Sequence, residues 1–164
     1  MGPGIYQSVK ISLPRAHMWV EVFRRNLTFS AIANLTWEIA HFPLYTLWLE
    51  GSLYEIVFAI IHCTFGDLMI AFFTLVFALI ALGIKGWPKT LFAPVPILAV
   101  ILGVGYTIFS EWNNVVVLKN WAYSEHMPLI PFFKVGLSPI AQWVIIPLTG
   151  LFWARRNVEF GDTK

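Results

Sequence analysis

Residues 53–84 decide the fold of this chain, and they read LYEIVFAIIHCTFGDLMIAFFTLVFALIALGI. Only two carboxylates and one histidine interrupt this apolar run, which is longer than the about 20 residues that cross a bilayer as a helix. The short sequence EGS at 50–52 precedes the run, and GWP at 86–88 follows it, where proline cannot continue a helix. The sequence therefore predicts a long membrane-spanning helix that pairs through a tight turn with the helix before it.

Three more apolar segments complete the expected architecture. We predict an all-α, polytopic membrane protein in which residues 1–164 form a single membrane domain, a four-transmembrane-helix bundle. Residues 112–137 would form an outer capping loop, and residues 14–23 a short N-terminal segment along the cytoplasmic interface. The four spans are expected at about 26–49, 53–84, 91–111 and 138–154.

The composition fits a lipid environment. The chain is 58% hydrophobic and only 12% charged, whereas about a quarter of the residues in soluble domains are charged. Membrane lipids are therefore the expected partners. The net charge of +2 is too small to indicate binding of nucleic acid.

Lysine and arginine are unevenly divided between the two sides of the predicted bundle. Nine of the 11 lie in the N-terminal segment, the second loop and the C-terminal tail, and only Lys119 and Lys134 lie on the other side. Because cytoplasmic loops carry the excess of positive residues, both termini are predicted to be cytoplasmic.

Polar side chains recur inside the predicted spans. Asn34, Glu38, His41 and Tyr45 form one stripe on the first helix, and the other spans add further polar groups. On a common depth scale these groups are expected between the middle of the membrane and its outer surface, with an apolar inner half. They predict a polar cavity that opens toward the outer leaflet.

Ionisable residues within a span are costly and are functional by default. We expect a membrane-embedded enzyme or binding protein that acts on a hydrophobic, lipid-like small molecule through acid–base groups. The expected catalytic residues are Glu38, His41, His62, Asp67 and Glu111. The expected ligand-binding residues are Trp37, Tyr45, Tyr106, Asn113, Tyr123, Gln142 and Trp143.

Other interpretations of the same residues remain open. Glu38 and His41 form one Glu-x-x-His motif, whereas di-iron bundles use that motif twice. A single metal ion, or a haem between His41 and His62, is an alternative, so no metal ligand is assigned and the cofactor is left undefined. Proton-coupled transport is another alternative. In the last alternative, the protein is an accessory subunit of an oligomer or of a larger membrane complex.

Two resemblances add to this reading. The residue types resemble those of the EXPERA-type four-helix membrane proteins, the sterol isomerase and sigma-2 receptor group, in which carboxylates, histidine and tryptophan share an intramembrane cavity. Residues 30–156 look like a group of small bacterial membrane proteins, which implies a multi-pass protein of the bacterial inner membrane and no particular function. That second resemblance rests on NLTWE (34–38), PLY (43–45), FSEWN (109–113), WAYS (121–124), MP (127–128), GLSP (136–139) and QW (142–143).

Overall fold

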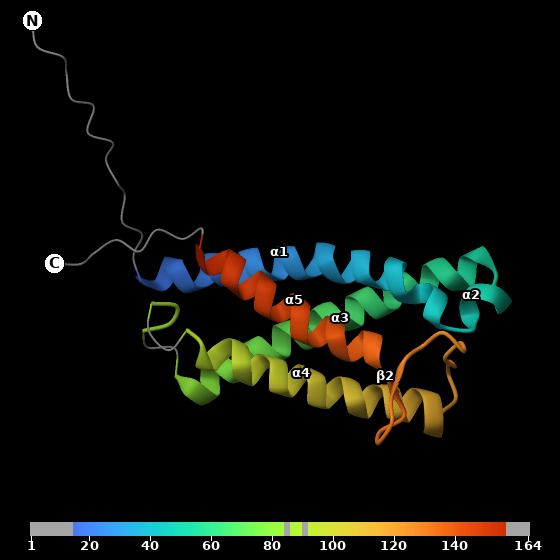
Figure 1. Ribbon diagram of the computed structural model, residues 1–164. Coiled ribbons are helices and arrows are strands. Elements are labelled where there is room, and N and C mark those ends of the chain that lie inside the picture. The colour runs from blue at the N-terminus through green and yellow to red at the C-terminus, as the bar shows by residue number, and fades with distance from the viewer. Residues whose placement is uncertain (1–14, 84–85, 90–91, 157–164) are drawn as a thin grey trace, which may run out of the picture.

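The computed structural model describes residues 15–83, 86–89 and 92–156, which are mostly helical. Four long helices pack together in a ring, in which α1 and α4 each contact both α3 and α5 (Figure 1). Five shorter elements connect them. The long helices are α1 (Arg15–His41), α3 (Leu53–Leu82), α4 (Pro94–Trp112) and α5 (Leu137–Arg156).

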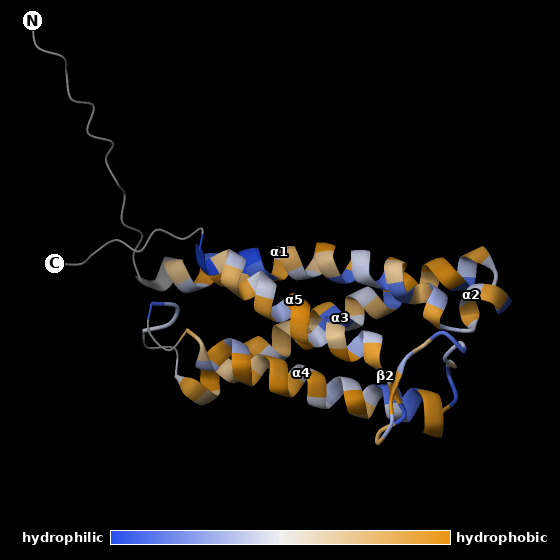
Figure 2. Ribbon diagram, in the orientation of Figure 1, coloured by the Kyte–Doolittle hydropathy of each residue, from blue (hydrophilic) through white to orange (hydrophobic). Residues whose placement is uncertain are grey.

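Three helices are long and apolar enough to cross a membrane, which indicates a membrane protein. They are α3, α4 together with its continuation to Val117, and α5. The fourth long helix, α1, is not among them, because polar residues are interspersed with apolar ones along it (Figure 2).

The bounds of α1 differ from the predicted first span. The helix ends at His41, because Pro43 follows, and a 3-10 turn (Phe42–Leu44) and the short helix α2 (Leu47–Glu50) continue the chain. At the other end α1 already begins at Arg15. The expectation of a separate surface segment at 14–23 is therefore wrong for residues 15–23, and residue 14 lies outside the described residues.

The hydrophobic core lies at one end of the bundle, which we call the core end. Here α1 and α4 begin, and α3 and α5 end (Figure 1). Small and branched side chains from all four helices interlock and exclude solvent. The buried cluster consists of Met18, Val22, Leu75, Ala78, Leu79, Trp87, Phe92, Val95, Ala99, Leu151 and Ala154.

The opposite end, which we call the cavity end, begins with a well-defined turn. Ser52 caps α3, because its hydroxyl accepts from the Glu55 N–H and the Glu55 carboxylate accepts from the Ser52 N–H. The predicted antiparallel pairing of α1 and α3 follows from this turn.

Residues 113–137 cover the cavity end. A π-helical turn (Asn113–Val117) extends α4, and two short antiparallel strands, β1 (Leu129–Ile130) and β2 (Val135–Gly136), precede α5. The loop is tied to the link between α1 and α2, since Thr46 N donates to Ala122 O at 3.0 Å and Ser124 N to Leu44 O at 2.9 Å. This part of the chain is compact, as the sequence predicts.

Candidate functional site

A cavity of about 1190 Å³ opens between α3 and α4 and extends under the covering loop. Its apolar wall comes mainly from α3 and includes Phe58, Met69, Phe73, Phe77 and Ile80. Its polar part lies at the cavity end. The polar lining comprises Glu38, His41, Tyr45, His62, Asp67, Tyr106, Thr107, Ser110, Glu111, Asn114, Asn120, Trp121 and Gln142.

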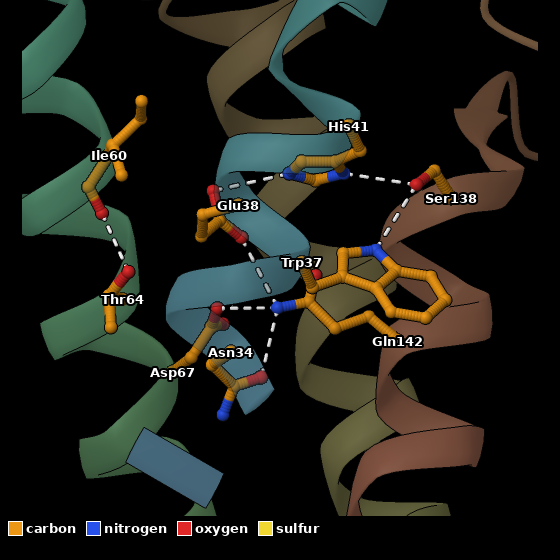
Figure 3. A network of polar contacts seen from close by, with 9 residues as sticks. All are labelled: Asn34, Trp37, Glu38, His41, Ile60, Thr64, Asp67, Ser138 and Gln142. Carbon is orange, nitrogen blue, oxygen red and sulfur yellow. Dashed lines mark hydrogen bonds and ion pairs between the residues drawn. The ribbon is translucent and has the colours of Figure 1, made fainter. Parts of the chain in front are cut away.

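The Gln142 amide on α5 joins the polar groups of three helices (Figure 3). Its Nε2 donates to Asn34 Oδ1 at 3.0 Å, to Glu38 Oε1 at 3.2 Å and to Asp67 Oδ2 at 2.8 Å. An amide nitrogen carries only two hydrogens, so three acceptors compete for two protons. Two carboxylates therefore converge on one donor with too few protons to satisfy all of the acceptors.

His41 links this amide hub to the first turn of α5 (Figure 3). Its Nε2 lies 3.2 Å from Glu38 Oε2, without the alignment of a full hydrogen bond, and its Nδ1 lies 3.0 Å from Ser138 Oγ. Ser138 Oγ also accepts from Trp37 Nε1 at 3.3 Å. A serine that accepts from Trp37 still has its own proton to donate to His41 Nδ1. In that arrangement Nδ1 is the acceptor, so the single N–H of a neutral imidazole is on Nε2 and faces Glu38.

A second polar contact lies on the α4 side of the cavity. The hydroxyl of Tyr123 donates to the buried carboxylate of Glu111 and accepts from Gly136 N at 3.0 Å. Burial, followed by the neighbouring Glu111 carboxylate, raises the pKa of Tyr123 well above that of a free tyrosine. Tyr123 therefore stays protonated and remains a hydrogen-bond donor to Glu111 at neutral pH.

Nine of the twelve predicted site residues line this cavity, and three do not. Trp37 and Tyr123 are not part of the lining: Trp37 donates to Ser138, and Tyr123 donates to Glu111. Asn113 lies in the π-helical turn that follows α4 and is not part of the lining either. The nine lining residues are Glu38, His41, Tyr45, His62, Asp67, Tyr106, Glu111, Gln142 and Trp143.

His62 lies apart from the carboxylate hub. Its side chain is exposed and stacks on Phe58 with ring centroids 5.7 Å apart, and the described contacts include none between His62 and Glu38. His62 therefore lies on the cavity wall, and no described contact joins it to the other predicted catalytic residues.

Sequence reasoning missed part of the polar arrangement. Ser138 contacts both His41 and Trp37, and only its place near the start of the fourth span pointed to it. The expectation of an apolar inner half is wrong, because Asn26 and Ser30 are 3% and 1% exposed near the core end. Their spacing of four residues continues the predicted stripe, which is the signal that could have identified them.

The described side chains contain no group of three or more His, Cys, Asp or Glu residues placed to hold a metal ion together. The geometry instead brings together two carboxylates, an imidazole, a hydroxyl and an amide within hydrogen-bonding reach. Such a set can hold and transfer protons next to a largely apolar cavity. In comparisons with known proteins, no family model, no curated protein and no solved structure matches this chain.

Proposed function

We propose that this protein binds a lipid-like amphiphile within the membrane and performs acid–base chemistry on it. The observation that carries the proposal is the cavity between α3 and α4, which has apolar walls and one polar end. Ligand pockets combine a mostly apolar lining with a few placed polar groups in this way. The volume of about 1190 Å³ suits a molecule with a long hydrocarbon part.

The apolar wall offers a lateral entrance for such a molecule. Phe73, Phe77 and Ile80 are 57%, 58% and 69% exposed, although they belong to a helix long enough to span a membrane. Residues of this kind face either hydrocarbon or a hydrophobic ligand. A ligand that arrives from the lipid phase would therefore slide between α3 and α4 without passing through water.

The polar end supplies the chemistry in this proposal. The Glu38 carboxylate is buried and the Asp67 carboxylate is half-buried, and one proton shared between them would relieve the repulsion of two like charges at close range. This proton also satisfies the acceptor that Gln142 cannot serve. The shared proton makes the pair of carboxyl groups a general acid, and the carboxylate left after proton transfer faces the Nε2–H of His41.

We also propose that α1 is a fourth span and that both termini are cytoplasmic. α1 packs from the core end, where Val22 is fully buried, to the cavity end, where His41 meets α5. Its outer side carries Ile32, Leu35 and Ile39, which are 65%, 41% and 56% exposed. The excess of lysine and arginine on the core-end side supports this orientation, in a bacterial inner membrane.

Reporter fusions test the orientation. Fusions after Gly51 and Lys119 should report the periplasm, and fusions after Lys85 and Lys164 the cytoplasm. A periplasmic signal after Lys85 would overturn the proposed orientation.

Two glycine substitutions test whether the cavity binds an amphiphile. Gly66 lines the cavity, Gly105 lies outside it on α4, and a Cβ on either would meet no atom within 4 Å. Gly66→Leu therefore places a side chain at the cavity from a position where its Cβ meets no other atom, and Gly105→Leu is the matched control. We expect Gly66→Leu to weaken quenching of tryptophan fluorescence by a brominated C18 alcohol in nanodiscs at least tenfold, with Gly105→Leu unchanged. Equal quenching in both variants would favour the role of an accessory subunit.

The chemistry has a separate test. Lipids extracted from the host membrane are incubated with purified protein, and the mixture is compared by mass spectrometry before and after. Glu38→Gln keeps the shape of the side chain but cannot transfer a proton, so it should retain the brominated alcohol and form no product. If wild type and Glu38→Gln yield the same lipid pattern, the protein is a binding protein and the acid–base part of the proposal is wrong.

A further inference from the structure

The described lining of the cavity is rich in carboxylates and contains no lysine or arginine. Its three carboxylates belong to Glu38, Asp67 and Glu111. A proton shared by Glu38 and Asp67 removes one negative charge, and His41, when protonated, balances one more. Even then, no described residue forms an ion pair with Glu111. Because a charge inside a membrane is costly without a partner, the polar end of the cavity lacks a positive group.

The contacts of Glu111 are all with neutral groups. This residue of α4 is only 8% exposed, and the Tyr123 hydroxyl donates to its Oε2. The indole Nε1 of Trp121 lies beside the same carboxylate, but without the alignment of a hydrogen bond. These two donors stabilise the charge of Glu111 and do not cancel it.

Thr107 gives a second, independent sign of a missing ligand. It is 5% exposed and lines the cavity, and its Oγ1 has no hydrogen-bond partner among the described residues. Thr64 and Thr149, in contrast, donate to the carbonyls four residues earlier at 2.8 Å and 2.6 Å, the usual way to satisfy a hydroxyl in a helix. A buried hydroxyl without a partner is costly. Thr107 therefore offers the cavity an open hydrogen-bonding group.

Thr107 and Glu111 lie on the same face of α4. Their spacing of four residues places them one turn apart, about 6 Å along the helix axis. Glu111 is also close enough to Glu38 and His41 for their charges to interact. A positive group bound by Thr107 and Glu111 would therefore lie near the acid–base residues.

A primary ammonium group on a long hydrocarbon chain fits these features. It carries one positive charge and three N–H donors, as the lysine side chain does, and like lysine it is protonated at pH 7. One N–H would donate to the Glu111 carboxylate and a second to Thr107 Oγ1. The hydrocarbon chain would lie along the apolar wall that includes Phe73 and Phe77.

Other positive or polar groups fit less well. An alcohol carries no charge, and a trimethylammonium group has no N–H to donate. A phosphate beside the amine, as in a phospholipid head group, would bring negative charge close to the carboxylates. An inorganic cation needs several ligands to replace its water, and the described side chains contain no group of three His, Cys, Asp or Glu placed to hold one.

We propose that the amphiphile bound in this cavity is a long-chain primary amine, whose ammonium group binds to Thr107 and Glu111. This inference rests on the proposed binding of an amphiphile and specifies its head group. The amine also supplies the positive charge that the described lining lacks.

Quenching of tryptophan fluorescence in phosphatidylcholine nanodiscs tests the head group. Three brominated C18 probes are compared at pH 7: a primary amine, the alcohol and a trimethylammonium. Wild type should bind the amine at least tenfold more tightly than either of the others. Glu111→Gln still accepts from Tyr123 but carries no charge, so it should lower the affinity for the amine at least tenfold and for the alcohol at most twofold. The matched control is Glu125→Gln, whose exposed side chain lies in the covering loop and should keep the wild-type preference.

Thr107→Val tests the second contact. Valine has the shape of threonine without the hydroxyl, so the affinity for the amine should fall at least threefold. Because Thr107 Oγ1 has no described partner, this variant should unfold at the wild-type temperature or higher. Thr64→Val is the matched control: it loses a hydrogen bond within α3, does not border the cavity and should keep the wild-type affinity.

The possible outcomes separate this inference from the proposed function. If wild type binds the amine no more tightly than the alcohol, the inference is wrong while the proposed binding of an amphiphile stands. Equally tight binding of the trimethylammonium probe would overturn the assignment of a primary amine, because charge alone would then suffice. If Gly66→Leu leaves quenching by the alcohol unchanged, the proposed function fails and this inference fails with it.

Discussion

Two glycines at different positions of the bundle show how its two regions differ. Gly103 on α4 lies directly against the indole of Trp143, so α4 and α5 meet there at the closest distance that glycine permits. Gly66 on α3 has nothing within 4 Å of where a Cβ would be, and it borders the cavity. The same residue type thus brings two helices together at one position and leaves open space at the other.

The difference extends to the whole of each end. At the core end, Leu75, Ala78 and Leu79 of α3 are at most 4% exposed, because all four helices interlock around them. Between α3 and α4 there is a cavity whose polar end is faced by groups of α1 and α5, and whose apolar lining continues along α3 as far as Ile80. The same helix therefore has one face that packs into the core and another that borders open space.

Substitutions two residues apart on α3 should give the largest contrast. Leu75 is 1% exposed in the core, and Leu75→Ala should lower the free energy of unfolding by about 2–4 kcal/mol through lost packing. Phe73 is 57% exposed on the cavity wall, and Phe73→Ala should change it by less than about 0.5 kcal/mol. Unfolding in mixed detergent micelles measures both, and equal losses would refute the division of α3 into a packed face and a face that lines the cavity.

The next effect concerns the hydrogen bond from Tyr123 to Glu111. Tyr123→Phe leaves the buried Glu111 carboxylate without the hydroxyl that donates to it, and it should lower the free energy of unfolding by about 1–3 kcal/mol. The exposed Tyr54 provides the control, since Tyr54→Phe should have no effect.

This contact also predicts a pH dependence. The pKa of Tyr123 is higher in the folded protein than in the unfolded chain. The contribution of Tyr123 to the free energy of unfolding is therefore complete below the unfolded pKa of about 10, and it declines as the pH rises above 10. The stability of Tyr123→Phe should therefore fall less steeply than that of wild type above pH 10. Parallel curves would show that Tyr123 is not shielded as the structure implies.

The smallest effect is expected at the exposed start of α1. Hydrogen bonds from Arg25 and Arg24 lower the pKa of Glu21. Glu21→Gln should lower the free energy of unfolding by about 0.5 kcal/mol or less, since exposed ion pairs contribute little to stability. The contribution is present above the unfolded pKa near 4.5 and is lost as the pH falls through the lower folded value. Unfolding of wild type and Glu21→Gln is compared at pH 7 and pH 3. An equal difference in stability at both pH values would exclude the ion pairs as the source of that difference.

The sequence predicted the apolar helices well, because length and hydropathy alone define them. The predicted spans 53–84 and 138–154 correspond closely to α3 and α5. The prediction failed on α1, whose first turns mix charged and apolar residues and looked like a surface segment. Met18 and Val22 are nevertheless buried there, because neighbouring helices cover that face.

The sequence predicted which face of the first helix carries the site, but not which residues meet across helices. The polar stripe on the first helix gave the positions of Glu38 and His41, since spacing along a helix determines which residues share a face. Which residues meet across helices depends on how each helix is rotated about its own axis, and packing sets that rotation. Hence the contact of His41 with Ser138 and the separation of His62 from Glu38 could not be read from one chain.

The row of buried polar residues on α1 has a consequence for how the chain enters its membrane during synthesis; the row consists of Asn26, Ser30, Asn34, Glu38 and His41. Insertion scales assign up to about 2.5–3.5 kcal/mol to one charged residue in a lone helix, and α1 carries Glu38 about one turn before its end, together with four other polar residues. Although α1 leaves the ribosome first, it gains its hydrogen bonds only from helices that follow it. We therefore expect α1 to wait at the translocon until α3, which follows it after the short helix α2 (Leu47–Glu50), inserts with it as a hairpin.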